Sequence, residues 1–120
     1  MLTITEAQME VLDLACYRRQ CITFVGQELW LLDCEVPERE LQLLFEQFLP
    51  LVDIRNQSDR LTLVLLMIAR LAFEELFTQQ EIPRLMDHLT TAEDRQQQLQ
   101  QILFQQGGYD TEFLHRKSWI

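Results

Sequence analysis

The residues that could carry out chemistry are few in this chain and lie far apart. Its histidines and cysteines, the usual ligands of zinc, are His88, His115, Cys16, Cys21 and Cys34. No group of them has the spacing of a zinc site. The two serines, Ser58 and Ser118, both lie outside a G-x-S-x-G elbow, and the chain has no glycine-rich phosphate loop.

Acidic pairs and a thiol are the remaining catalytic possibilities. Glu74-Glu75 and Glu93-Asp94 are adjacent in sequence, so on helices their side chains point about 100° apart and form no dyad unaided. Cys21 could act as a nucleophile only beside a folded base, whereas free cysteine is commonly a core residue. We therefore expect no enzymatic activity, no metal and no cofactor.

Composition favours one all-α domain. The chain has 120 residues, 48% of them hydrophobic, with only three glycines and three prolines. An all-β sandwich needs a turn about every 8–12 residues, and these turn formers are too few for that. The net charge of −9 argues against binding to nucleic acid or to anionic membrane surfaces. Free thiols and the lack of a signal peptide predict a cytoplasmic protein.

One stretch predicts the centre of the fold. Residues 61–73 read LTLVLLMIARLAF and are apolar on nearly every helical face. Such a helix must be surrounded by others. We expect it to span about residues 59–78, capped by Asn56 or Ser58, with Arg70 reaching a carboxylate or water at the end of the core.

The surrounding segments read as amphipathic helices, giving a bundle of about five. Their expected ranges are 6–31, 37–47, 83–89 and 92–106. Thr5 begins a capping box with Gln8, and Thr90 begins another with Glu93. Pro37 suits the first turn of its helix, and Pro50 should kink or end that helix near Gln47. Gly107-Gly108 should end the last helix with a left-handed C-cap.

The last twelve residues differ from the rest of the chain. We expect a helical domain over 1–108 and a tail over 109–120 that packs on the body or on a partner. Residues 1–110 carry 8 basic and 18 acidic side chains, or −10, whereas 111–120 carry two and one, or +1. We favour the tail folding back onto the body; docking into a partner is the alternative.

The opening MLTITEAQMEVLDLA resembles small helical accessory proteins of bacterial type VI secretion effector clusters. The resemblance continues through the polar turn at residues 55–59 and the Leu71-Ala72-Phe73 step, and it thins out after about residue 75. The chain departs from the pattern at Pro50 and Arg70. The resemblance implies a co-chaperone-like protein that helps to load an effector, beside a larger adaptor chaperone. It assigns no functional residues.

Together these observations predict a non-catalytic interaction protein whose partner is an effector, an adaptor chaperone or a toxin. The expected partner-binding anchors are large aromatic or arginine side chains: Trp30, Phe113, Arg116 and Trp119. The alternative is an immunity protein whose acidic surface mimics an anionic substrate and blocks a toxin. A homodimer is also compatible with the sequence.

Overall fold

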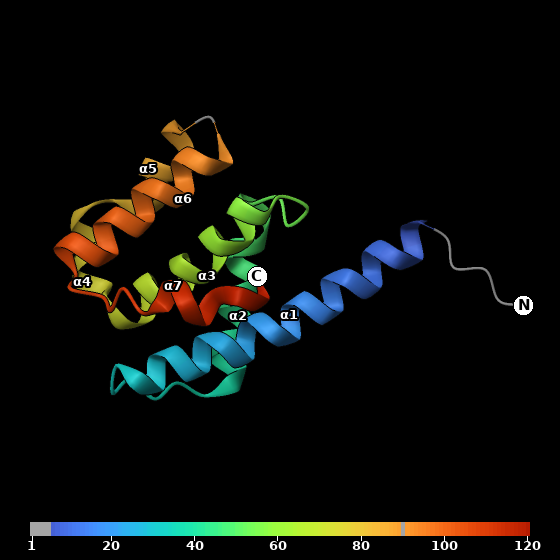
Figure 1. Ribbon diagram of the computed structural model, residues 1–120, viewed down its shortest axis with the longest axis horizontal. Coiled ribbons are helices and arrows are strands. Elements are labelled where there is room, and N and C mark those ends of the chain that lie inside the picture. Colours follow the sequence, from blue (N-terminus) through green and yellow to red (C-terminus); the bar gives the residue numbers. More distant parts are fainter. Residues whose placement is uncertain (1–5, 90) are drawn as a thin grey trace, which may run out of the picture.

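The computed structural model describes the backbone of residues 6–89 and 91–120, and the side chains of residues 13–89 and 91–120. Within these ranges the chain is mostly helical and contains no strand, which confirms the all-α prediction. It forms seven α-helices rather than about five, because the expected central helix divides in two and the tail contributes a short helix of its own (Figure 1).

The first helix, α1, spans Glu6–Leu31, the range that the sequence predicts. Its first turns project beyond the rest of the molecule, and its second half lies against the body (Figure 1). Gly26 is partly buried there, and a Cβ added to it would lie 3.5 Å from a methyl group of Leu41. The expected Thr5–Gln8 cap lies outside the described side chains.

Helix α2 spans Glu38–Phe48 and presents a fully apolar stripe to the core. Pro37 stands at its N-cap, one position before the expected first turn, and its carbonyl accepts the amides of Glu40 and Leu41. The helix ends one residue later than expected, and Pro50 then lies in a 3₁₀ turn over Leu49–Leu51. This ending is the expected effect of proline, which cannot continue the helical hydrogen bonds.

Helix α3, Gln57–Ala72, is the buried centre of the fold. The Asn56 side chain caps it by accepting the amides of Ser58 and Asp59, at 2.9 and 3.3 Å. The expected helix to about residue 78 is wrong, because the backbone leaves helical geometry at Phe73 and resumes as α4, Glu74–Gln79. The break lets the Phe73 ring pack on Tyr109, with 5.8 Å between ring centroids.

The remaining helices close the core from the other side. Helix α5 spans Ile82–His88 after a left-handed turn at Glu81, and α6 spans Ala92–Gln101. Thr91, one residue after the predicted cap, accepts the amide of Asp94 at 3.1 Å. Residues Ile102–Gln106 form a π-turn, and Gly108 then takes the left-handed conformation that the sequence predicts, with φ +68°.

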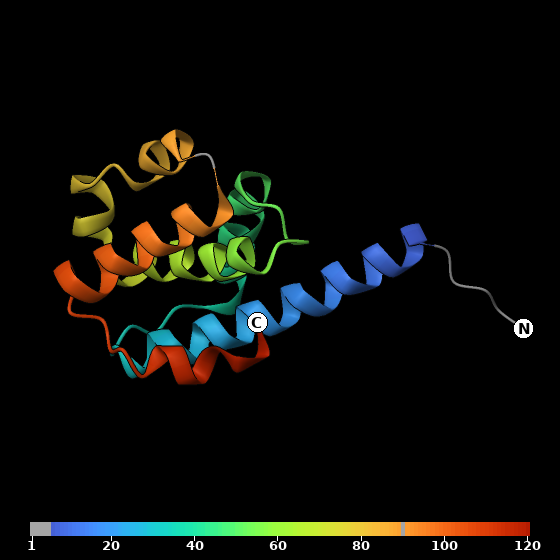
Figure 2. The ribbon, with the colours of Figure 1, turned by 45° about the horizontal axis from the view of Figure 1, so that its top comes forward.

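The C-terminal residues run back across the body (Figure 2). They form α7, Phe113–Arg116, and a 3₁₀ turn over Lys117–Trp119. Both ribbon views place this tail beside the second half of α1, and the Phe113 side chain is fully buried. None of the helices in the described part of the chain is both long and apolar enough to span a membrane.

Candidate functional site

The chemistry-bearing side chains do not converge. Among the described residues, no three histidine, cysteine, aspartate or glutamate side chains gather as metal ligands would. Glu112 and His115 have the Glu-x-x-His spacing used by di-metal bundles, yet both are exposed on the tail. All three cysteines are free, as the sequence predicts.

Cys21 is a buried core thiol. Its side chain has no exposed surface, and its Sγ lies 3.9 Å from the sulfur of Met67. Burial raises the pKa of this thiol to about 12, so it stays protonated at neutral pH. Because the thiolate is the reactive form, Cys21 is poorly suited to nucleophilic chemistry.

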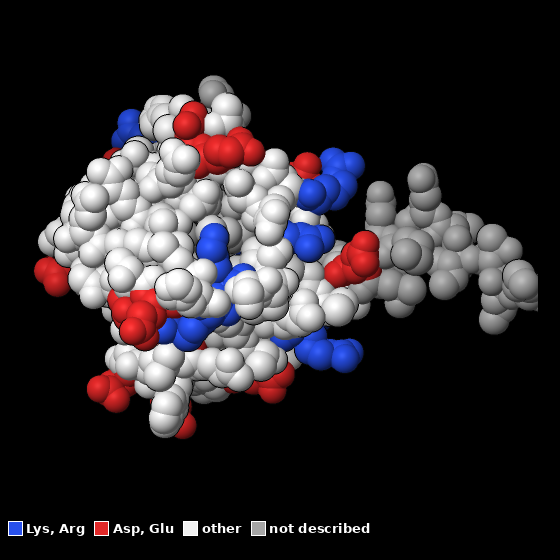
Figure 3. Space-filling model, in the orientation of Figure 1, with Lys and Arg blue, Asp and Glu red and all other residues white. Residues whose placement is uncertain are grey.

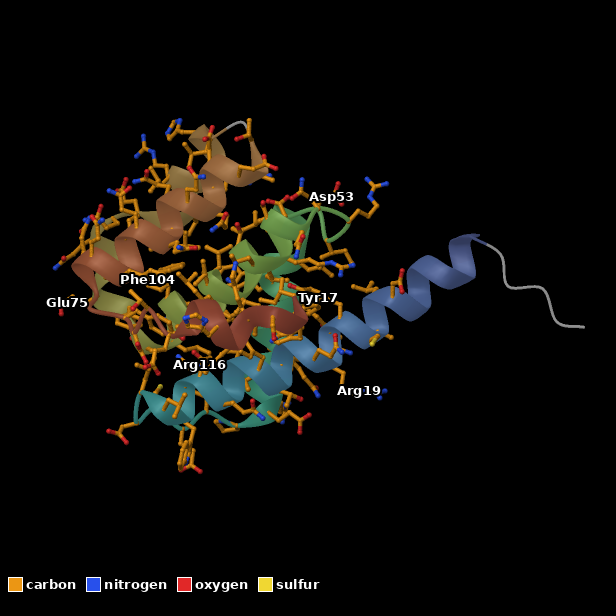
Figure 4. The ribbon with its side chains drawn as sticks, in the orientation of Figure 1. Tyr17, Arg19, Asp53, Glu75, Phe104 and Arg116 are labelled. Atoms are coloured by element: carbon orange, nitrogen blue, oxygen red, sulfur yellow. The ribbon has the colours of Figure 1, made fainter. Side chains whose placement is uncertain are left out.

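Two buried carboxylates are the most unusual polar features of the structure. The first, Glu28 on α1, is only 2% exposed. Arg116 binds it with both arms of its guanidinium: Nε to Oε2 at 2.8 Å and Nη2 to Oε1 at 2.9 Å. The hydroxyl of Tyr109 also donates to Oε1. In Figure 4, Arg116 lies on α7 directly over α1.

Each partner of Glu28 shows the effect of this contact. The hydrogen bond to Glu28 raises the pKa of Arg116 above its usual value. The pKa of Tyr109 is raised mainly by burial and further by its hydrogen bond to the Glu28 carboxylate. Tyr109 therefore remains a neutral donor and Arg116 a cation, so the carboxylate receives one hydrogen bond from a neutral hydroxyl and two from a guanidinium.

The second buried carboxylate is Asp59, in the first turn of α3. Its side chain is 2% exposed, and Arg95 of α6 donates to both oxygens at 2.9 Å. The backbone amide of Asp53 donates to it as well, at 2.9 Å. This contact fixes α6 and the loop before α3 to the start of the central helix.

Figure 3 shows how the other charges are distributed, with acidic and basic side chains interleaved over one face of the body. Several are paired at the surface, including Arg18 with Glu46 at 2.7 Å. Arg70 binds Glu74 at 3.2 Å, which confirms that it reaches a carboxylate. Exposed pairs of this kind contribute little to stability.

The four expected anchors fall in two different places. Trp30, near the end of α1, is 71% exposed, and the adjacent Leu31 is 55% exposed. Phe113, Arg116 and Trp119 instead pack within the chain: Phe113 and Trp119 lie against Phe24, at ring-centroid distances of 5.6 and 5.2 Å. Among the four, Trp30 is therefore the one that is largely exposed to solvent.

The surroundings of Trp30 are apolar and acidic. We call Trp30, Leu31 and the acidic side chains Asp33 and Glu35 the Trp30 surface. All four are exposed, and the chain carries no lysine or arginine between Arg19 and Arg39. A large aromatic side chain is thus displayed beside acidic side chains, an arrangement that suits contact with an apolar pocket with a basic rim.

The sequence reasoning missed the buried carboxylates and their partners. A signal was present for Glu28, which lies three residues after Val25 and one before Leu29, in the register of the buried face. Asp59 was recognisable as a first-turn acid of α3 but not as a buried one. Nothing in the sequence indicated that Arg116 and Arg95 would be their partners.

Comparison with known proteins gives no relative: no family model matches the chain, and neither a curated protein nor a solved structure is significantly similar to it. Function must therefore be argued from the geometry itself.

Proposed function

We propose that this protein is a non-catalytic interaction module that binds another protein through the Trp30 surface. The observation that carries the proposal is the exposure of Trp30, 71%, next to Leu31 at 55%. An exposed tryptophan is unfavourably solvated when no partner is bound, and its burial at an interface contributes strongly to the free energy of binding. Tryptophan is among the residues most enriched in binding hot spots.

The charge around Trp30 defines the partner further. The exposed carboxylates of Asp33 and Glu35 lie in the connector that follows α1, and Glu38 and Glu40 open the next helix. A partner with an apolar pocket and lysine or arginine on its rim would complement this end of the molecule. Such charges speed association and select among partners more than they add affinity.

The sequence resemblance suggests which partner to test first. A type VI secretion effector, or the adaptor chaperone that loads it, is the partner we propose, and the role is stabilisation or loading of that effector. This identity is supported by the resemblance alone, whereas the interaction role is supported by the Trp30 surface.

The test uses purified components and calorimetry to measure binding to a candidate type VI secretion effector and to a candidate adaptor chaperone. Trp30→Ala should weaken binding by about 2 kcal/mol or more, roughly thirtyfold. Leu31→Ala and Leu51→Ala form a matched pair, since both leucines are exposed, at 55% and 44%, but Leu51 follows the far end of α2. Leu31→Ala should weaken binding and Leu51→Ala should not.

Each variant should keep the helical far-ultraviolet spectrum of the parent, because none of the three side chains is part of the core. Equal affinity of Trp30→Ala and the parent would refute the Trp30 surface as the binding site. Equal losses for the two leucine variants would refute it as well.

The acidic charge favours a second candidate, an immunity protein that blocks a toxin. Its net charge of −9 could mimic an anionic substrate. The same purified complexes separate the two roles. An inhibitor abolishes the toxin's activity in the mixture, whereas a loading factor leaves the activity intact and increases the effector's solubility or secretion.

A further inference from the structure

The C-terminal segment, Tyr109–Ile120, is held to the body mainly by its side chains. The amide of Tyr109 still bonds to the carbonyl of Leu103, at 2.9 Å. From residue 110 onward, the backbone-to-backbone hydrogen bonds in the described part of the chain close within the segment itself, and the carbonyl of Ile120 also accepts the side-chain amide of Gln57, at 3.4 Å. A segment attached in this way can leave as a unit without breaking the hydrogen bonds of the helices beneath it.

On α1, three side chains contribute to the surface that receives the segment, beside Phe73 and Phe104 from other elements. We call Tyr17, Phe24 and Glu28 the Glu28 groove. In Figure 4, Tyr17 of α1 lies nearer than Arg116 of α7 to the projecting N-terminal end of α1. Trp119 packs against both aromatic rings, with centroids 6.1 Å from Tyr17 and 5.2 Å from Phe24. Arg116 occupies the Glu28 end.

The chemistry of the groove selects its occupant. A buried carboxylate gains little net stability from a salt bridge, but it strongly disfavours any occupant that leaves it unpaired. When the segment leaves, Glu28 returns to water and the penalty disappears. The groove therefore recognises an arginine and an aromatic side chain at a fixed spacing, and this recognition does not depend on which chain supplies them.

The docked state also carries a cost that eases release of the segment, the step that must precede exchange. The indole Nε1 of Trp119 is buried and has no hydrogen-bond partner in the described part of the chain. A buried donor without an acceptor disfavours the state in which it occurs. The connection to the body is Gly107-Gly108, where Gly108 has φ +68°, a region that glycine enters and leaves easily.

We propose that the Glu28 groove also accepts the C-terminal segment of a second copy, so that two chains exchange segments about Gly107-Gly108 and form a reciprocal dimer. Exchange of an identical element reuses existing contacts and is a low-cost route to dimers. The two bodies both carry net negative charge, so added salt should favour the dimer by screening their repulsion. The proposal is independent of the Trp30 surface.

Charge reversal provides the test. In Glu28→Arg the groove and the segment both carry arginine, and in Arg116→Glu both carry glutamate, so neither variant can pair within itself or with its own kind. Mixed together, each groove finds an opposite charge on the other chain's segment. Each variant alone should be monomeric by native mass spectrometry, and the equimolar mixture should form a heterodimer, more of it at higher salt.

Trp119 reports docking in the same samples. The chain has two tryptophans, so a Trp30→Phe background leaves Trp119 as the only one. Its emission should shift to longer wavelength in each single variant and return in the mixture. The double variant Glu28→Arg/Arg116→Glu pairs within one chain and serves as the folding control. The proposal is overturned if the variants remain helical but their mixture stays monomeric and the Trp119 emission does not return to the shorter wavelength.

A second measurement covers the case in which a charge-reversal variant does not fold. Full-length Arg116→Gln, a milder change, is titrated with a fluorescein-labelled peptide of residues 109–120. The native peptide should bind saturably, and a peptide carrying Arg116→Glu should bind at least tenfold more weakly. No saturable binding of the native peptide, or equal binding of both peptides, overturns the proposal.

Discussion

Replacing Arg95 with methionine should destabilise the fold by about 3–5 kcal/mol, because it removes the partner of a buried charge. Arg95 donates to both oxygens of Asp59 at 2.9 Å through Nη2, and a third bond from Nε is 3.2 Å long. The Asp59 side chain is only 2% exposed. After the substitution, the Asp53 amide would be the remaining donor to this carboxylate.

A second variant separates the cost of an unpaired charge from the value of the pair. In Asp59→Leu/Arg95→Met both charges are gone, and the main remaining penalty is the unpaired amide of Asp53, about 1–3 kcal/mol. The double variant should therefore be roughly 2 kcal/mol more stable than Arg95→Met alone.

Urea unfolding followed by circular dichroism measures these differences, provided that each variant unfolds in one transition with an unchanged slope. Arg70→Met is the control, because Arg70 and Glu74 are 42% and 70% exposed and should contribute less than about 1 kcal/mol. The reasoning fails if Arg95→Met loses less than about 1 kcal/mol. It also fails if the double variant is less stable than Arg95→Met.

Three further predictions follow from local contacts. Asn56→Ala should cost about 1 kcal/mol by removing the cap of α3, and Asn56→Asp should restore it; equal urea midpoints for the two variants would contradict the cap. Exposed Cys16 should be alkylated readily by iodoacetamide, while buried Cys21 should react only when the protein unfolds. Peptide mapping by mass spectrometry measures both rates, and comparable rates would show that Cys21 is not protected. Burial raises the pKa of Cys21 to about 12 and that of Tyr17 above its ordinary value, so the folded state holds protons that the unfolded chain releases. The free energy of unfolding should thus be constant below about pH 8.5 and fall above it, by up to about 1.4 kcal/mol per pH unit for each group. An unchanged urea midpoint between about pH 8 and 10.5 would contradict this.

The sequence was sufficient where local signals decide the structure. Glu6–Leu31 was predicted as one helix with its observed bounds, and Asn56 was one of two caps proposed for the central helix. It failed at Phe73, where the predicted helix continued and the structure breaks. At the break the Phe73 ring packs against Tyr109, a residue far away in the sequence, and no pattern within residues 57–79 indicates that contact.

The candidate site was predictable only in part, for the same reason. Trp30 was selected because it is a large aromatic residue, but its exposure depends on how the helices around α1 pack. Glu28 stood visibly in the buried register of α1, yet its partner Arg116 is 88 residues away. Periodicity indicates which face of a helix is buried, and it does not indicate which distant side chain will meet that face.

The two buried ion pairs specify the packing register of the helices, which the apolar pattern alone does not. Leucine-rich helices can pack in several registers of similar energy, because apolar contacts are not directional. A wrong register here would leave Glu28 or Asp59 buried without its arginine, at a cost of several kcal/mol against a typical total stability of about 5–15 kcal/mol. Both partners are arginines that donate from two nitrogens, a geometry that lysine cannot reproduce. We infer that Glu28 positions the C-terminal segment and Asp59 positions α6, so that the leucine-rich core supplies stability and the two carboxylates select the arrangement.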